Sequence, residues 1–484
     1  MYEKNKSGIY LKIRFKFAET TGKLSKPVVK LGRGAGKSFP GFLFLKLGSY
    51  SSLKELAKKP SIGTIMITGT NGKTTTTKFT SMLLERDANI SYNFESNTLN
   101  AIVTGLLADK IDLGVFEYGI RDILHAIPDT VCELVNPVGV VYTTISREHS
   151  QVAGAKNPFK DYFRAKQLLS LPMKRGVIIC NADDPRTAYI GKEKESDVHV
   201  TYYGFDLDLE DKIPLTDNVL CPACGNNLIY SKYYMNHRGF YSCKCGFSRP
   251  EPDIKITKLV RSPYKWNVTI EGSLYNYSTD TDVSVNSTLD LPSFGIHNVY
   301  NVLCAVTNYI SFTPCPENVE KTIQMTFKNI DMSILPPGRF EIFKILDKLV
   351  GIGQGDNGDA MRANMQFMEN YVNKDFEIIY TTPDGGEEEI FEDHINSIKT
   401  GTPQKIYVIP GRKSIEAAQN YYKEIEKSFK AEFYPVPYDE MNKKIDTIIE
   451  LILNSDAKYM LVSGCGPEEY MWKQLKERCK SIVN

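Results

Sequence analysis

The sequence has almost no net charge, no long apolar stretch and only two tryptophans. Lysine plus arginine number 59 and aspartate plus glutamate 58 among 484 residues, so the formal net charge is +1 at pH 7. No bulk field of either sign is available to attract nucleic acid or an anionic membrane, although a local patch can still exist. No apolar run approaches the ~18 residues that a membrane helix needs. We therefore expect neither a nucleic-acid partner nor a membrane span.

The sequence also lacks the marks of an exported protein. Charged residues interrupt the first 17 residues, where a secretory signal needs a continuous apolar stretch. Ten cysteines in a chain of this length are too few for a secreted disulfide scaffold. Apolar residues make up 42% and charged residues 24%, which are values typical of a globular protein. We expect a soluble, cytoplasmic protein of roughly three domains.

Short runs of β-branched residues alternate with helical patterns, and this alternation predicts an α/β fold with mostly parallel sheets. We expect a short basic N-terminal domain at residues 1–60, a central domain at 61–334 and a C-terminal α/β domain at 335–484. In the last of these, the pattern predicts a helix over residues 415–427 with Ser414 as its N-cap. The expected strands are Thr64–Ile67, Leu113–Phe116, Val138–Tyr142, Gly176–Cys180, Lys405–Ile409 and Lys458–Val462.

A glycine-rich turn follows the first of these strands. It lies in the segment Thr-Gly-Thr-Asn-Gly-Lys-Thr-Thr at residues 68–75 and leads into a helical pattern. Gly69 and Gly72 let the backbone approach phosphates, and the helix N-terminus directs N–H groups toward them. Lys73 would contact the β- and γ-phosphates, and Thr74 would offer its hydroxyl to Mg²⁺. The segment therefore predicts a phosphate-binding loop, although the first glycine of the strict Walker spacing is missing.

Four of the ten cysteines are bunched in one segment. Cys221 and Cys224 form a CxxC pair, Cys243 and Cys245 form a CxC pair, and a glycine follows each pair. Two such knuckles predict a tetrahedral zinc site in an insert at about residues 218–250. All four ligands would come from the protein, so the zinc would be structural. The alternatives are His237 as a substitute ligand and a set of reduced, unligated cysteines.

Taken together, the motifs resemble those of the Mur ligase superfamily, whose members add amino acids to cell-wall precursors. The phosphate loop TGTNGKTTT has the form found in that family, and further family segments follow in the family's order over about residues 60–484. These are Glu117 after an apolar run, Thr143–His149, Arg164–Lys166, Cys180–Pro185, Gly295–Asn301, Gly338-Arg339 and Gly464–Glu468. The resemblance implies a Mur ligase architecture in which a central P-loop ATPase domain carries the zinc ribbon and a Rossmann-like C-terminal domain follows.

The resemblance also implies roles for individual residues. The residues expected to serve catalysis are Lys73, Glu117, His149 and Lys166, the last in carbamoylated form. Mg²⁺ would bind to Thr74, Glu117 and His149. ATP would contact residues of the phosphate loop, the asparagines of the helix start and the C-terminal domain, namely Gly69, Thr70, Asn71, Gly72, Lys73, Thr74, Thr75, Asn298, Asn301, Arg339 and Asp356.

A four-cysteine ribbon inserted in a Mur-type central domain resembles the MurT group, which works with a glutaminase partner on lipid II. Residues 31–41 are similar to the N-terminal segment of that group. Two C-terminal segments typical of MurT are missing, and the corresponding region, residues 351–359, reads Gly-Ile-Gly-Gln-Gly-Asp-Asn-Gly-Asp. These departures favour a related branch, the pseudomurein peptide ligases of methanogenic archaea (pMurC or pMurE type). The resemblance of this sequence to these ligases implies a UDP-linked peptide and a free amino acid as substrates, with ATP, Mg²⁺ and structural Zn²⁺ as cofactors.

The expected reaction is formation of an amide bond through an acyl phosphate. Arg339 and Asp356 would help to hold nucleotide from the C-terminal domain. The loop of residues 354–359 would either face the incoming amino acid or form a polar surface loop. One alternative is a MurT-type subunit of a glutamine-dependent, lipid-linked amidotransferase with a glutaminase partner. Another is a nucleotide-binding homologue without ligase activity. Two departures from the family's segments would favour it: Glu148 stands where the family usually has aspartate, and Cys465 stands where many members have lysine. Folylpolyglutamate synthesis is a further ligase alternative, which the zinc insert disfavours.

Overall fold

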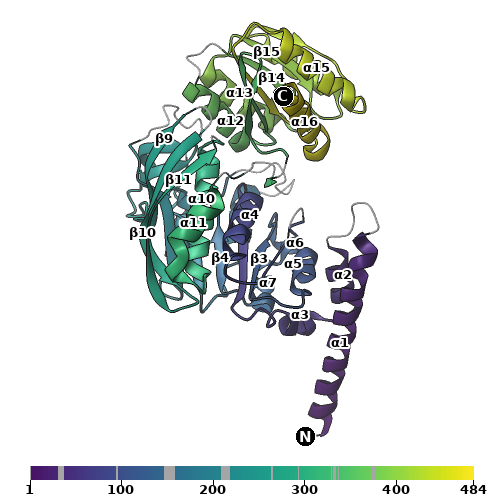
Figure 1. Ribbon diagram of the computed structural model, residues 1–484, viewed down its shortest axis with the longest axis vertical. Helices are drawn as coiled ribbons and strands as arrows, with labels where there is room; N and C mark the ends of the chain where they lie inside the picture. Colours follow the sequence, from purple (N-terminus) through teal and green to yellow (C-terminus); the bar gives the residue numbers. More distant parts are fainter. Residues whose placement is uncertain are drawn as a thin grey trace.

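The computed structural model describes residues 2–30, 38–93, 96–146, 158–208, 219–262, 265–292, 294–328, 330, 334–335, 337–371 and 376–483. Three regions follow one another along the molecule (Figure 1). A helical N-terminal region lies at one end, a large sheet with its helices occupies the middle, and a second α/β region lies at the other end. This is a mixed α/β fold with largely parallel sheets.

The central sheet has nine strands in the order β11-β10-β9-β6-β5-β4-β1-β3-β2. The neighbours from β2 to β6 and on to β9 are parallel, whereas β10 and β11 add an antiparallel extension. The first four predicted strands are confirmed to within one or two residues. The strand bounds are β1 Gly63–Thr68, β2 Ile90–Tyr92, β3 Leu113–Glu117, β4 Gly139–Tyr142, β5 Val177–Asn181, β6 His199–Phe205, β9 Ile254–Arg261, β10 Lys265–Asn276 and β11 Thr281–Pro292.

Register places the carboxyl ends of three central strands at one edge of the sheet. Ile67 of β1 pairs with Glu117 of β3, and Thr68 pairs with Tyr142 of β4. Ligand sites of open parallel sheets lie at this edge. The helices of this region are α4 Lys73–Leu84, α5 Leu99–Leu106, α6 Ile123–Ala126, α7 Pro128–Val135, α8 Pro158–Gln167, α9 Pro185–Lys192, α10 Ile296–Phe312, η1 Pro316–Asn318 and α11 Val319–Phe327.

The C-terminal sheet has six strands in the order β12-β13-β17-β14-β15-β16. Only β12 is antiparallel to its neighbour. Ser414 caps the helix that follows β15, because its hydroxyl accepts a hydrogen bond from the Ala417 N–H as predicted. The bounds are β12 Glu341–Ile345, β13 Lys348–Gln354, α12 Gly358–Tyr371, β14 Glu377–Thr382, α13 Glu388–Gly401, β15 Lys405–Pro410, α14 Ile415–Ile425, β16 Ala431–Phe433, α15 Met441–Asn454, β17 Tyr459–Gly464, η3 Glu468–Trp472 and α16 Lys473–Val483.

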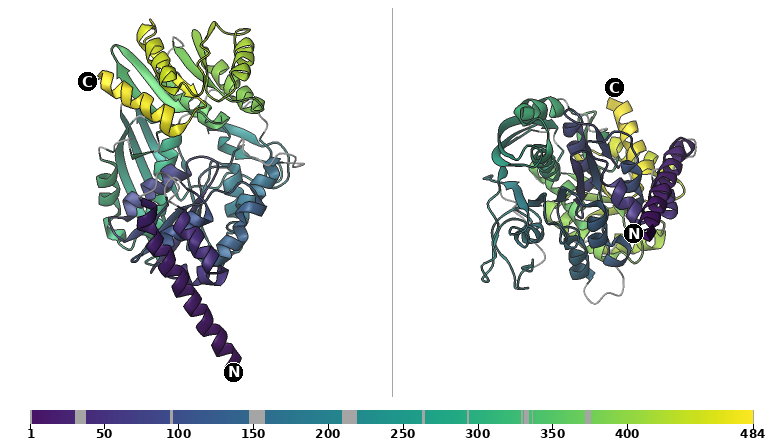
Figure 2. Two further views of the ribbon diagram at one scale, coloured as in Figure 1. Left: turned by 90° about the vertical axis from the view of Figure 1, so that its right-hand side faces the viewer. Right: turned by 90° about the horizontal axis from the view of Figure 1, so that it is seen from below.

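Three helices precede the central sheet: α1 Tyr2–Lys30, α2 Phe39–Leu47 and α3 Tyr50–Leu56. The inner side of α1 packs on α2, where the rings of Phe15 and Phe44 meet edge to face at 6.1 Å. The outer part of α1 extends beyond the body of the molecule (Figures 1 and 2). Among the residues that the structure describes, no helix is both long and apolar enough to cross a membrane.

Between β6 and β9 the chain forms a separate two-stranded hairpin, β7 Ile229–Met235 and β8 Arg238–Ser242. Met235 pairs with Arg238, so Asn236 and His237 form a two-residue turn at the tip. Asn236 has a φ of +51°, a left-handed conformation that asparagine tolerates better than most residues. The two cysteine pairs lie just before β7 and just after β8, at the opposite end of the hairpin from this turn.

Candidate nucleotide site and zinc ribbon

The phosphate loop joins β1 to α4 and depends on two glycines. Gly69 has a φ of +150°, and a Cβ there would lie 2.0 Å from the Thr143 hydroxyl oxygen. Gly72 has a φ of +86°, and a Cβ there would lie 2.3 Å from the Asn301 side-chain oxygen. A side chain at either position would therefore both strain the backbone and collide with a neighbour. The helix N-terminus at Lys73 follows directly, so its first N–H groups face the loop.

Thr74 and Glu117 form a pair of oxygen ligands beside this loop. The Thr74 hydroxyl donates a hydrogen bond of 2.7 Å to Glu117 Oε2, and Asn97 donates one of 3.2 Å to Glu117 Oε1. Glu117 is buried and also exchanges two backbone hydrogen bonds with the Asn93 side chain, which fix its position at the end of β3. A hydroxyl beside a carboxylate suits Mg²⁺, which prefers oxygen ligands and retains several waters. His149 and Glu148, predicted next to them, lie outside the described residues.

Two lysines contact the loop from different sides. Lys73 Nζ donates a hydrogen bond of 2.7 Å to the Thr70 carbonyl. Lys166 is buried on α8, donates to the carbonyls of Gly69 at 2.9 Å and Ile120 at 3.1 Å, and lies 4.5 Å from the centre of the Tyr162 ring. Lys166 therefore connects the start of the phosphate loop to the segment after β3. Its carbamoylation stays a prediction.

A cavity with about 670 Å³ of empty space, part of it open to solvent, lies between the phosphate loop, the start of α10, the β7–β8 hairpin and the C-terminal region. Of the predicted ATP contacts, Asn71, Gly72, Thr75, Asn298, Asn301 and Arg339 line it. Four lining residues each have a buried polar atom without a hydrogen-bond partner among the described residues: Thr75 Oγ1, His297 Nδ1, Arg339 Nε and Asp359 Oδ2. Buried polar atoms are nearly always paired, so this set indicates that the cavity receives a polar ligand.

Other predicted contacts lie elsewhere. Four predicted ATP contacts belong to the phosphate loop but are not among the described residues that line this cavity: Gly69, Thr70, Lys73 and Thr74. Asp356 is not among them either: its carboxylate pairs with Arg412 at 2.9 Å and accepts a hydrogen bond from Gln354. Within the same loop, Gln354 and Asp359 do line the cavity, so part of residues 354–359 faces this space.

Sequence reasoning missed several lining residues. Burial lowers the pKa of His297 to about 3, and the nearby guanidinium groups of Arg238 and Arg339 add to this shift, so its imidazole is neutral. Arg238 lies 5.1 Å from the centre of the Tyr300 ring. Met235 and Arg238 come from the hairpin tip, which is distant in sequence from the phosphate loop. Of these residues, His297 and Tyr300 stood inside a recognised motif, and no local signal marked Met235 or Arg238.

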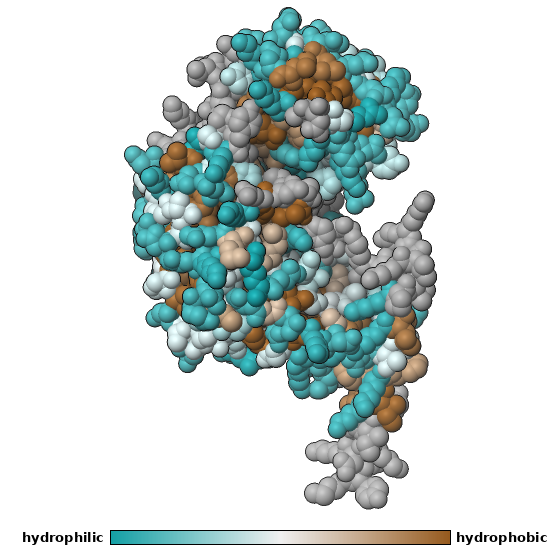
Figure 3. Space-filling view, viewed as in Figure 1, coloured by the Kyte–Doolittle hydropathy of each residue, from teal (hydrophilic) through white to brown (hydrophobic). Residues whose placement is uncertain are grey.

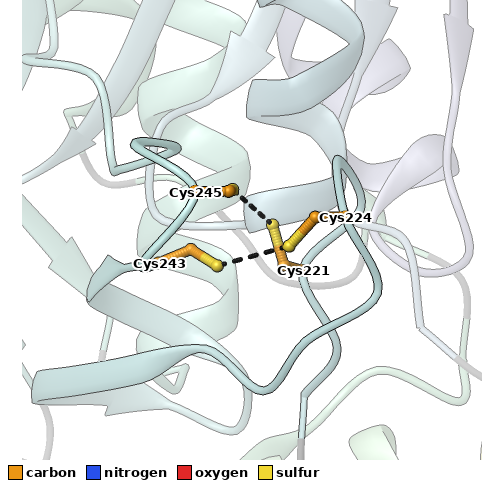
Figure 4. Close-up of side chains that lie close together, drawn as sticks. All are labelled: Cys221, Cys224, Cys243 and Cys245. Carbon is orange, nitrogen blue, oxygen red and sulfur yellow. Dashed lines mark hydrogen bonds between the residues drawn. The ribbon is translucent and has the colours of Figure 1, made fainter.

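The four cysteines of the insert converge on one point (Figure 4). Their sulfur atoms all lie within 4.8 Å of one another, with Sγ–Sγ distances of 3.8 Å for Cys221–Cys245 and 3.5 Å for Cys224–Cys243. A zinc tetrahedron with bonds of ~2.3 Å has sulfur–sulfur edges of ~3.8 Å, so the four sulfurs fit the ion. His237 is not part of this group of four.

Backbone geometry around the cysteines also fits zinc knuckles. Gly225 and Gly246, which follow the second cysteine of each pair, have φ values of +78° and +92°. The Phe247 N–H donates to Cys245 and is the main cause that lowers the pKa of this thiol to about 7. N–H groups directed at sulfur stabilise the thiolate that binds metal. Both glycines therefore adopt the left-handed backbone that such tight turns favour.

The hairpin is attached to the central region by buried contacts with two aspartates. His237 Nε2 lies 3.0 Å from Asp184 Oδ2, and Arg249 Nε lies 2.7 Å from Asp183 Oδ1. Burial opposes ionisation of Asp184, but His237 and the Ile145 N–H outweigh it and hold the pKa of this carboxyl below its usual range. Asp183 and Asp184 belong to the Asn-Ala-Asp-Asp-Pro element, which thereby joins the insert to the central sheet.

The hairpin tip also contacts the C-terminal region. Asn236 Nδ2 donates a hydrogen bond of 2.7 Å to Asp359 Oδ1, and Gln366 Nε2 donates one of 3.2 Å to the Tyr234 carbonyl. A third contact joins the phosphate loop to the same region through the side chains of Asn71 and Asn357, at 3.2 and 3.4 Å. The C-terminal region therefore closes the cavity by contacts with both the loop and the hairpin.

A second, wider cleft lies on the other side of Glu117. It has a volume of 2410 Å³, open to solvent, and lies between α2–α3 and the segments around Asn97 and residues 118–127. Its cationic lining residues are Arg14, Lys46 and Arg121. Because Asn97 both lines the cleft and hydrogen-bonds Glu117, the cleft adjoins the Thr74–Glu117 pair.

Comparisons with known proteins agree with this site. Residues 67–218 match the model of the Mur ligase middle domain. MurT, a subunit of the glutamine-hydrolysing lipid II isoglutaminyl synthase of Streptococcus pneumoniae, is 28% identical over 331 residues, which cover 66% of each chain. These matches support the predicted resemblance to the Mur ligase superfamily. MurT of Staphylococcus aureus is also similar, at 25% identity over 72% of this chain and 73% of its own length. The match thus spans slightly less than two thirds of the pneumococcal relative.

Solved Mur ligases share the fold. A pseudomurein peptide ligase type C from Methanothermus fervidus superposes with a TM-score of 0.66 at 22% identity, covering 88% of this chain and 80% of the other. MurF from Acinetobacter baumannii gives a TM-score of 0.59 at 16% identity, covering 92% and 81%. The predicted Mur ligase architecture is therefore confirmed. Mur ligases are ATP-dependent and use Mg²⁺, in agreement with the chemistry of the phosphate loop and the Thr74–Glu117 pair.

Proposed function

We propose that this Mur ligase joins a free amino acid to the carboxylate of a UDP-linked peptide precursor of a pseudomurein-type cell wall. The observation that carries the proposal is the cavity lined by Asn298, Asn301 and Arg339, next to the Thr74–Glu117 pair. The structural likeness to a pseudomurein peptide ligase supports the choice of substrate class.

In the proposed reaction, a carboxylate oxygen of the acceptor peptide attacks the γ-phosphorus of ATP, and ADP leaves. The amine of the amino acid then attacks the acyl carbon, and phosphate leaves with the C–O bonding electrons. Lys73 and the helix N-terminus stabilise the charge that develops on the transferred phosphoryl group. The wide cleft beside Glu117 supplies a route for the acceptor, and its cations suit an anionic substrate.

A second candidate is favoured by the sequence relatives, which are MurT subunits of glutamine-hydrolysing enzymes. In that case ammonia, released from glutamine by a partner subunit, would replace the amino acid, and the acceptor would be lipid-linked. The two candidates share the phosphoryl-transfer half of the reaction and differ in the nucleophile and the carrier. They are therefore separated by the products and not by ATP hydrolysis.

Mass spectrometry of reactions with defined components tests the proposal. The full chain is incubated with MgATP, with UDP-linked or lipid-linked peptide, and with each amino acid or ammonium. We expect ADP and phosphate only when both acceptor and amino acid are present, and an acceptor heavier by one amino-acid residue. Conversion of a carboxyl to an amide by ammonium would favour the MurT-type alternative. No turnover with any pair would contradict a ligase function. Lys73→Ala is the inactive control, and Lys399→Ala, at an exposed lysine of α13, is its matched control.

A further inference from the structure

Helix α1 has an exposed apolar face that covers nothing in the described part of the molecule. Ile13, Phe17 and Leu24 are 63%, 60% and 68% exposed. Their spacing of four and seven residues places them on one face of the helix, which we call the α1 stripe. The opposite face holds the buried residues Ala18 and Gly22, which pack toward α2. The α1 stripe therefore points away from the body of the molecule, and Figure 3 shows apolar surface on α1 beside hydrophilic residues.

The same helix concentrates positive charge. Residues 2–30 contain eight lysines and arginines and two acidic residues, a net charge of +6, so the other residues together carry −5. Lys12 and Lys16 are exposed and lie one residue before Ile13 and Phe17, which places them beside the stripe. Glu19 does not offset them, because it pairs with Lys59 at 2.6 Å and with Lys23 at 3.4 Å.

We propose that α1 docks this protein on an anionic lipid surface, with the α1 stripe among the acyl chains and the flanking lysines at the headgroups. An apolar stripe with lysines beside it is the pattern of helices that lie in a membrane interface. Charge complementarity selects a lipid surface over a second copy of this chain, since two α1 stripes in contact would bring the exposed Lys12 and Lys16 of one copy close to those of the other. The helix lies on the surface and does not span it, in agreement with the absence of a spanning helix among the described residues.

Vesicle binding tests this inference without any need for turnover, so its failure would leave the proposed ligase function intact. The full chain is sedimented with phosphatidylcholine vesicles that contain or lack phosphatidylglycerol. We expect binding to the anionic vesicles, at least about tenfold weaker binding to the neutral ones, and a further loss at high salt. The triple variant Ile13→Ser/Phe17→Ser/Leu24→Ser should bind roughly 1,000-fold more weakly, because each of the three large side chains contributes on the order of tenfold.

Two further variants keep the result interpretable. The charge variant Lys12→Glu/Lys16→Glu leaves the stripe intact and should lose binding to anionic vesicles only. The matched control Val260→Ser/Met325→Ser/Leu346→Ser changes three apolar residues of the other domains, exposed by 51%, 52% and 63%, and should bind like the wild type. No binding to anionic vesicles, or equal binding by stripe and control variants, would overturn the proposal. The proposal would also be overturned by a stripe variant that binds vesicles normally and loses only its self-association or its binding to a protein partner.

Discussion

The hydrogen bond between Asn236 and Asp359 offers the sharpest test of whether the cysteine-bearing insert takes part in the proposed nucleotide binding. Asn236 is at the tip of the ribbon hairpin, Asp359 begins α12 of the C-terminal domain, and both residues are partly exposed. Asn236→Asp keeps the shape of the side chain and tolerates the left-handed backbone at this turn, where alanine would add strain. The substitution replaces a donor with a second carboxylate and so turns an attraction into a repulsion.

The magnitude follows from the geometry. A hydrogen bond to a charged group contributes about 1.5–3 kcal/mol, and partial exposure favours the lower value of about 1.5 kcal/mol. At about 1.4 kcal/mol for each factor of ten, the closed arrangement loses about tenfold in population. The contacts of Asn71 with Asn357 and of Gln366 with Tyr234 remain, so closure is weakened but still occurs. We therefore expect KM for ATP to rise about tenfold, with kcat nearly unchanged at saturating ATP.

Steady-state ADP release, or calorimetric titration with a non-hydrolysable ATP analogue, measures this change. The swapped double variant Asn236→Asp/Asp359→Asn restores one donor and one acceptor, so it should bind nucleotide more tightly than the product of the single effects predicts. Asn226→Asp, at an exposed position of the same insert, is the matched control. A nucleotide affinity of Asn236→Asp within twofold of the wild type, in a variant with normal thermal stability, would refute the role of this contact in closure.

Four further predictions concern the rest of the site. Lys73→Ala should lower kcat by roughly 10²–10³-fold, because a cation near the developing charge is lost, while the thermal unfolding midpoint stays unchanged. Thr74→Val removes one oxygen ligand without changing side-chain size and should raise the Mg²⁺ concentration needed for half-maximal rate by at least tenfold; an unchanged requirement would contradict the Thr74–Glu117 site. Cys221→Ser should reduce the zinc content, measured by atomic absorption, from about one ion per chain to almost none. Asp184→Asn should lower the free energy of unfolding by about 3 kcal/mol at pH 7, since it breaks a buried pair. The folded-state pKa of Asp184 is depressed, so its contribution is present above the ordinary carboxyl value of about 4 and lost at lower pH, and urea titrations should show the difference from wild type shrink there.

Features set by neighbouring residues could be predicted from the sequence. The strand before Gly69, the N-cap at Ser414 and the positive φ values at Gly225 and Gly246 each depend on a few consecutive residues. Register then brings Glu117 to the edge where the phosphate loop begins, because parallel strands end at the same side of a sheet. The cavity wall could not be predicted in this way. Met235 and Arg238 reach it only because an insert folds back onto the central domain, and no local pattern encodes that path.

The net charge also shows where prediction from the sequence alone fails. A value of +1 for the whole chain gives no reason to expect an electrostatic surface, yet it is the sum of +6 on α1 and −5 elsewhere. Fields near a surface fall off within about 10 Å at 0.1 M salt, so the charge of a segment that extends from the body acts on its own. Only the structure shows that α1 extends in this way (Figure 2) and that the residues of its apolar stripe are exposed.

The position of the cysteines gives the zinc ribbon a role beyond holding its own loops together. The two knuckles clamp one end of the β7–β8 hairpin, and the other end carries Asn236 with Met235 and Arg238 on either side of the turn. Buried pairs with Asp183 and Asp184 attach the turn and the segment after β8 to the central sheet. A short two-stranded hairpin is at best marginally stable alone, so the knuckles and these pairs together must hold its tip at the cavity. Mutations in the knuckles should therefore weaken nucleotide binding as well as the fold of the insert. They would do so by displacing the hairpin tip from the cavity, while the phosphate loop stays intact.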